Sequence, residues 1–267
     1  MAVQTKKKTP DQPKPQISQR TDSWWVSPLV FAVVFGFFAL WATFRAFQNN
    51  YYEVGHYLSP FYSPTIKLPW KIAGLDISPA LIILPFPLAF RMTCYYYRKA
   101  IYRSFAADPL ACAVREPEPL NKLRWKSYTG ERLFPLIAMN FHRFAFYCAV
   151  FFIVLLWYDA LKAFLFIDAS GANHFGMGIG TLIFVANVCL LSLYTFSCHS
   201  WRHLIGGKVD CYSCTALNKT RYGLWTKISF INAEHGKYAM MSLVSVLVTD
   251  IYVYLLATKV ITDIRFF

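Results

Sequence analysis

The 267-residue chain is 56% hydrophobic and only 15% charged, whereas a soluble domain usually carries about 25% charged residues. Its charges crowd into a few segments between long apolar runs, which is typical of a bilayer-spanning chain and excludes one large soluble core. The net charge is +13, but the excess lysine and arginine lies between the apolar runs, so membrane topology accounts for it better than nucleic-acid binding does.

We expect an all-α protein, an integral membrane bundle of five transmembrane helices over residues 24–267. A disordered tail is expected before it, because residues 1–23 are polar and rich in lysine and proline. A spanning helix needs about 20 apolar residues. The stretches that satisfy this length are, in chain order, residues 24–47, 79–97, 135–167, 175–204 and 233–261.

Positive residues predict the orientation of these spans, because they accumulate on the cytoplasmic side. The segments 6–20, 115–132 and 208–227 fall on one side of the predicted bundle and carry fourteen lysines and arginines together. The opposite side carries four, which are Lys67, Lys71, Lys259 and Arg265. We therefore expect a cytoplasmic N-terminus and a multi-pass protein of the inner cell membrane.

Soft metal ligands gather toward the cytoplasmic ends of the predicted spans. Imidazole and thiol groups inside a bilayer are costly and tend to be functional, and helix bundles often hold metal sites in their cores. The alternative is that each histidine is a hydrogen-bonded polar residue between helices. The candidate metal ligands are Cys94, His142, Cys198, His199 and His235, with His203 one turn nearer to water than His199.

Two redox chemistries fit these ligands. A haem b with two histidine ligands could use His142 with His199 or His235. A Rieske-like two-iron, two-sulfur cluster takes two cysteines and two histidines, which Cys94, His142, Cys198 and His235 could supply. The short Cys-x-His loops of soluble Rieske domains are absent. We favour the cluster because the two cysteines lie at the same depth as the histidines, whereas a haem would not need them.

Other polar residues add two hypotheses. Arg91, Tyr95 and Arg143 are candidate quinone-binding residues, although both arginines could instead extend to lipid headgroups. Cys211 and Cys214 form one C-x-x-C pair in a polar loop, which is a weak zinc or redox signal and is more often an ordinary surface loop.

Several segments together resemble a known family, the membrane-anchor (cytochrome b-like, C) subunit of bacterial succinate dehydrogenases of the single-chain, five-helix type. The resemblance covers most of residues 24–267. It is carried by residues 93–99, 108–114, 141–143, 193–200, 202–203 and 249–252.

The resemblance implies partners and a role. The family anchors a flavoprotein subunit with FAD and an iron–sulfur subunit, both cytoplasmic, and passes electrons from succinate to a membrane quinone. Its members act as respiratory complex II, hold haem or an iron–sulfur cluster, contact lipids and can form higher oligomers. Two other functions compete with this one: a transporter or channel subunit, and a purely structural anchor without a redox centre.

Overall fold

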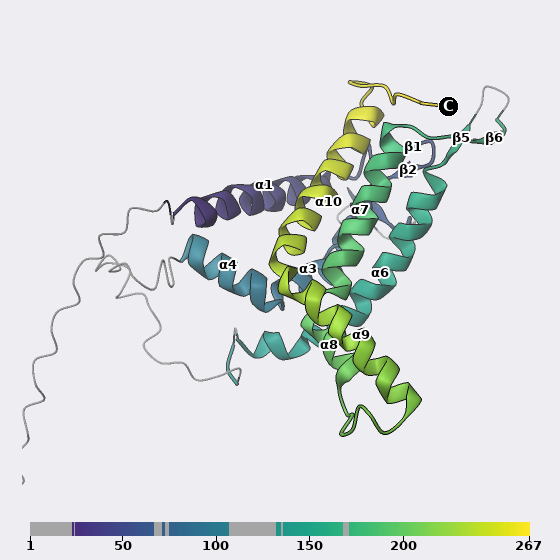
Figure 1. Ribbon diagram of the computed structural model, residues 1–267. Helices are drawn as coiled ribbons and strands as arrows, with labels where there is room; N and C mark the ends of the chain where they lie inside the picture. Colours follow the sequence, from purple (N-terminus) through teal and green to yellow (C-terminus); the bar gives the residue numbers. More distant parts are fainter. Residues whose placement is uncertain are drawn as a thin grey trace, which may run out of the picture.

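The computed structural model describes residues 23, 25–66, 71–72, 75–106, 132–134, 136–167 and 171–267. The predicted tail, residues 1–23, lies outside these ranges except for Ser23. Within them the chain is mostly helical, as expected from the apolar runs, and the helices build one bundle (Figure 1).

Four helical segments are long and apolar enough to cross a membrane. They are α1 (Val26–Gln48), η2 with α6 (Leu136–Lys162 together), α7 (Ile179–Phe196) and α10 (His235–Ala257). A fifth segment, Pro79–Met92 with Tyr95–Phe105, passes the same test only as a pair bent by 85°. The described residues thus carry four spans, or five if the bent pair is one span.

Two of the predicted spans are each broken at a cysteine. The predicted helix 79–97 is three helices, α2 (Pro79–Ile83), α3 (Pro85–Met92) and α4 (Tyr95–Phe105). The predicted helix 175–204 is two, α7 and α8 (His199–Gly206). Cys94 and Cys198 interrupt them, because each has an extended backbone (ψ 128° and 144°) that cannot continue an α-helix.

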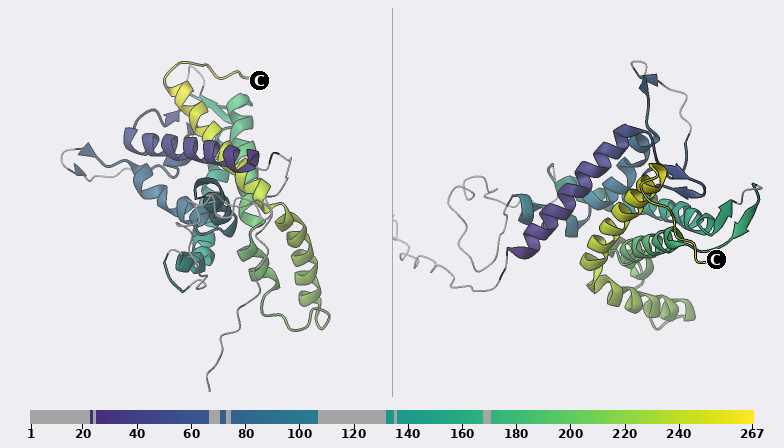
Figure 2. Two further views of the ribbon diagram at one scale, coloured as in Figure 1. Left: turned by 90° about the vertical axis from the view of Figure 1, so that its left-hand side faces the viewer. Right: turned by 90° about the horizontal axis from the view of Figure 1, so that it is seen from above.

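Three helices form the centre of the bundle. Helix α7 packs against both α10 and α6, and the three run side by side in Figure 1. Helix α3 packs on α6, while α1 lies along α4 and crosses α10 (Figures 1 and 2). The outer faces expose large apolar side chains such as Leu40, Phe144 and Val154, each more than 60% exposed. A continuous apolar exterior of this kind fits lipid better than water.

Irregular structure gathers where α6 ends and α7 begins, which we call the hairpin end. Strands β5 (Leu165–Ile167) and β6 (Asn173–Phe175) form an antiparallel hairpin there. Two further antiparallel hairpins pair β1 (Glu53–Val54) with β2 (Tyr57–Leu58) and β3 (Lys71–Ile72) with β4 (Leu75–Asp76). The turn of β1 and β2 and the last residues of the chain also lie at the hairpin end.

The opposite end of the bundle, where α7 ends and α10 begins, is called the site end. It carries α8 and an unexpected helix, α9 (Ala216–Ala233), which folds back along α8. Thr215 caps α9 by accepting a hydrogen bond from the amide of Asn218. Because α9 is largely polar, its hydropathy gave no sign of a helix.

Candidate functional site

Four helix starts converge at the site end. Cys94 and Cys198 are the N-cap residues of α4 and α8, and His142 and His235 are the first residues of α6 and α10. At each of these two helix breaks the chain turns at a cysteine, and the thiol of that cysteine is buried inside the bundle.

The four side chains meet as two thiol–imidazole pairs. His142 Nε2 lies 3.0 Å from Cys198 Sγ, and His235 Nε2 lies 3.5 Å from Cys94 Sγ. Both thiols are almost completely buried, at 3% exposure for Cys94 and 1% for Cys198. Four donors from four helices thus lie together in the interior.

Hydroxyl groups determine which nitrogen of each imidazole carries the proton. Thr93 donates its only hydroxyl proton to the Ala89 carbonyl (2.7 Å), so toward His142 Nδ1 (2.9 Å) its oxygen acts as the acceptor. The proton of His142 is therefore on Nδ1, and the lone pair of Nε2 faces Cys198.

His235 is oriented in the same way. Ser197 donates to the Tyr194 carbonyl (3.1 Å) and accepts from His235 Nδ1 (2.8 Å), so the lone pair of His235 Nε2 faces Cys94. A hydrogen bond at the far nitrogen is the usual support of a metal-binding histidine.

Aromatic rings fix the planes of both imidazoles. The ring of Phe90 stacks on His142 with centroids 4.9 Å apart and planes 2° apart. Tyr194 stacks on His235 at 5.1 Å and 21°. Each imidazole is held by a hydroxyl at one nitrogen and a ring on its face, which leaves only Nε2 available to bind.

A buried cation lies beside the pairs. Arg91 is 7% exposed, and its Nη atoms donate to the Ala239 carbonyl and to Ser242 Oγ, each at 3.2 Å, as well as to the Tyr97 hydroxyl. Its guanidinium also lies over the Tyr194 ring at 4.9 Å. All of these partners are neutral, so Arg91 places a positive charge inside the bundle and does not extend to lipid headgroups.

The other candidates lie outside this cluster. Tyr95 and Arg143 are exposed, so the structure separates them from the buried Arg91. His199 and His203 pair with each other on α8, Nε2 to Nε2 at 2.8 Å. Burial, then the charges of His203 and Arg202, lower the pKa of His199. Cys211 and Cys214 are joined by a disulfide.

Comparison with known proteins identifies a family for this chain. The family model described as actinobacterial succinate dehydrogenase subunit SdhC matches residues 26–259. The chain belongs to this family. A solved structure, the Mycobacterium smegmatis Sdh1 complex in the apo form, contains a chain 41% identical that covers 97% of this chain and 98% of its own length, with a TM-score of 0.79. No curated protein matches.

The resemblance to a succinate dehydrogenase anchor is thereby confirmed. Within this SdhC-family chain, no three His, Cys, Asp or Glu side chains of the described residues could hold one metal ion. The site consists of two pairs of donors and not of one cage. Sequence reasoning missed the supporting residues Phe90, Thr93, Tyr194 and Ser197, although Thr93 and Ser197 each directly precede a candidate cysteine.

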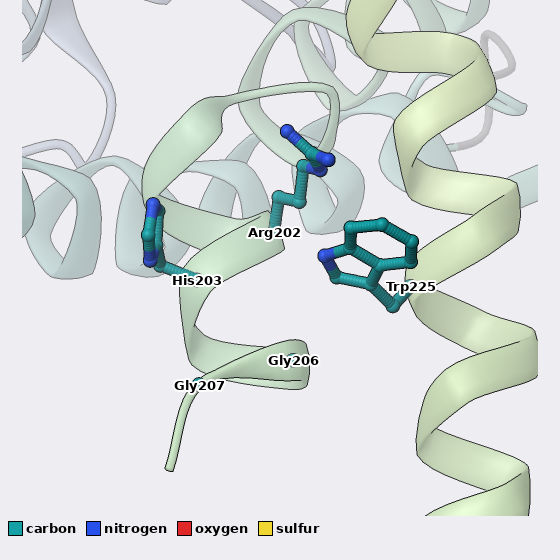
Figure 3. Close-up of a pocket in the computed structure, with 5 residues that line it drawn as sticks. All are labelled: Arg202, His203, Gly206, Gly207 and Trp225. Carbon is teal, nitrogen blue, oxygen red and sulfur yellow. The ribbon is translucent and has the colours of Figure 1, made fainter. Parts of the chain in front are cut away.

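Helices α8 and α9 enclose a small cavity of about 260 Å³ at the site end (Figure 3). The guanidinium of Arg202 lies over the Trp225 ring at 4.6 Å and donates from Nε to Ser229 Oγ at 2.8 Å. Trp225 thus packs within the α8–α9 hairpin.

Proposed function

We propose that this chain is the membrane anchor of a succinate dehydrogenase complex, and that it passes electrons from soluble subunits to a membrane quinone through a centre at the site end. Membership of the SdhC family supports the anchor role. The observation that carries the redox role is the convergence of Cys94, His142, Cys198 and His235 as two pairs, each a buried thiol with a partly buried imidazole.

The donor set fits a Rieske-like two-iron cluster. It offers two thiols and two imidazoles, the ligands of such a cluster, and two pairs suit a binuclear cluster better than one ion. The Cys94–His235 contact is 3.5 Å and the His142–Cys198 contact is 3.0 Å. Because Rieske-like clusters place both imidazoles on one iron, both thiol–imidazole contacts must open on binding.

A haem b fits less well. A haem with two histidine ligands needs imidazoles that face each other across an open slot for the porphyrin. Here Nε2 of His142 and of His235 each face a thiol at 3.0–3.5 Å, and Phe90 and Tyr194 cover the ring faces. The packed rings and thiols occupy the space that a porphyrin would need.

The chain's own residues would hold the centre as follows. Thr93 and Ser197 keep the protons on Nδ1, which leaves both Nε2 lone pairs free to bind. Both thiols must lose their protons to bind metal. The cation of Arg91 lies over the Tyr194 ring, which stacks on His235, so a positive charge stands beside the site. When bound, the cluster would supply a one-electron carrier between the soluble centres and quinone.

The partners and orientation follow from the same proposal. The flavoprotein and iron–sulfur subunits would dock on the cytoplasmic side, at the site end, where α8 and α9 extend beyond the spans. Segment 208–227 contributes four cations there, whereas Lys162, Lys259 and Arg265 lie at the hairpin end. The positive-inside rule therefore favours a cytoplasmic site end, in the inner cell membrane.

The deciding experiment replaces Cys94 and Cys198 separately by serine in the purified complex, and measures iron, acid-labile sulfide, haem and flavin. Each variant should lose the iron and sulfide of one two-iron cluster while flavin stays. The matched controls are Cys148→Ser and Cys189→Ser, which remove free cysteines outside the cluster. Full iron and sulfide in both site variants would reject the cluster and favour an anchor without a centre.

A further inference from the structure

The hairpin end contains a second cavity, of about 590 Å³, far from the two cysteine–histidine pairs. The β1–β2 turn, strand β5 and the segment after α10 enclose it. Its apolar lining includes Leu165, Phe166 and Leu256, and its basic lining consists of His56, Lys259 and Arg265. The cavity is therefore amphipathic, with an apolar wall and a basic rim.

The two lining cations are not ion-paired with the lining carboxylate. Asp263 is the acidic residue that lines the cavity, and its carboxylate already accepts from the hydroxyls of Tyr57 (2.7 Å) and Tyr252 (2.6 Å) and from the amide of Gly180 (3.0 Å). Across the described part of the chain, Lys259 and Arg265 form no ion pair. The rim thus keeps two cations available for an external anion.

The chain after α10 is held in place before any ligand binds. Arg265 forms a β-bridge with Gly178, and the Ile179 amide donates to the Ile264 carbonyl at 3.0 Å. The guanidinium of Arg265 lies over the Phe166 ring at 4.4 Å, at the boundary between the basic rim and the apolar wall. Binding therefore needs little ordering of this segment.

The surroundings show what kind of molecule fits. Val260, Ile264 and Phe267 beside the cavity are each more than 55% exposed, so this edge faces the bilayer where α10 ends. A free phosphate would leave the apolar wall unfilled, whereas a phospholipid covers it with the upper part of its acyl chains. We propose that the cavity binds an anionic phospholipid, with the headgroup phosphate at Lys259 and Arg265. The proposal needs only that the chain spans a membrane, and not that it carries a redox centre.

The test measures phosphatidylglycerol binding to the detergent-purified complex by native mass spectrometry, with phosphatidylcholine as the neutral lipid. Lys259→Gln and Arg265→Gln should each weaken phosphatidylglycerol binding about five-fold, as expected for loss of one cation near a membrane surface. Lys162→Gln is the matched control, since it removes one cation at the same end but outside the cavity. Lys259→Arg and Arg265→Lys should retain binding.

Two results would overturn the proposal. One is equal binding in the cavity variants and in Lys162→Gln. The other is displacement of phosphatidylglycerol by millimolar inorganic phosphate, which would make this a small-anion site. A measurement on the unaltered complex guards against misfolded variants: a photoactivatable phosphatidylglycerol should label peptides from residues 256–267, and labelling elsewhere alone would also reject the site.

Discussion

Arg45 on α1 donates from Nε to Asp250 Oδ2 on α10 at 3.0 Å, and both side chains are completely buried. Other polar groups form hydrogen bonds to both members of the pair. Asp250 also accepts from Trp41 (2.6 Å) and Ser59, while Arg45 donates to the carbonyls of residues 50 and 51. These contacts join α1, the loop after it and α10 into one unit.

Removing one member of this pair should destabilise the bundle strongly. Asp250→Asn leaves the guanidinium of Arg45 buried without its counter-charge, a loss of about 3–5 kcal/mol for a buried pair. We expect a lower thermal unfolding temperature for the purified complex. The double variant Arg45→Met with Asp250→Leu should be less destabilised than Asp250→Asn alone, because no unpaired charge remains. Equal loss in both would mean that packing, and not charge, dominates here.

The hydroxyls that accept from Nδ1 of His142 and His235 should control metal affinity. Thr93→Val and Ser197→Ala remove the acceptors of the Nδ1 protons, and loss of such support typically costs about 10–100-fold in metal affinity. Iron content of the complex after graded chelator treatment measures this. Thr43→Val is the control, because Thr43 also donates to the carbonyl four residues earlier but supports no histidine. Unchanged iron retention in both site variants would show that the histidines do not bind through Nε2.

The sequence predicted the apolar helices and the common depth of the candidate residues because both depend on patterns along the chain. Apolar runs define the spans, and distance from a span end sets the depth of a side chain. His142, His235, Cys94 and Cys198 lie together at the site end, and their role as metal ligands stays a prediction. His199 was also a candidate, but it follows the break at Cys198, which turns it toward His203 and the surface.

The helix breaks at Cys94 and Cys198 leave no such pattern in the sequence. No glycine or proline marks Cys94 or Cys198, and their extended backbone is set by tertiary packing. The two- and three-residue hairpins are too short for an alternating pattern, and the polar helix α9 has no membrane-span signal. The buried Arg45–Asp250 pair joins residues 205 apart, so it could not be read from local sequence.

The three candidate quinone-binding residues differ in their burial. Arg91 is inside the bundle, whereas Tyr95 and Arg143 reach its exterior, where a lipid-soluble quinone arrives. We expect Arg143→Gln to raise the KM for quinone about ten-fold or more, since a hydrogen bond from a charged group contributes about 1.5–3 kcal/mol. Succinate oxidation by a soluble dye should stay unchanged. Lys162→Gln, at the hairpin end, serves as the control, and an unchanged KM in Arg143→Gln would remove Arg143 from the site.

The orientation of the chain in the membrane can be tested by labelling each end of the bundle. A cytoplasmic site end predicts that Lys219→Cys in α9 is reached by a membrane-impermeant maleimide only in inverted vesicles. Ala172→Cys in the β5–β6 turn should react only in intact cells. Both positions are exposed, and the unaltered chain gives the background labelling of its free cysteines. The reverse pattern would place the cysteine–histidine pairs on the outer side, away from subunits that supply electrons from the cytoplasm, and would contradict the proposed electron path even if the cluster itself were found.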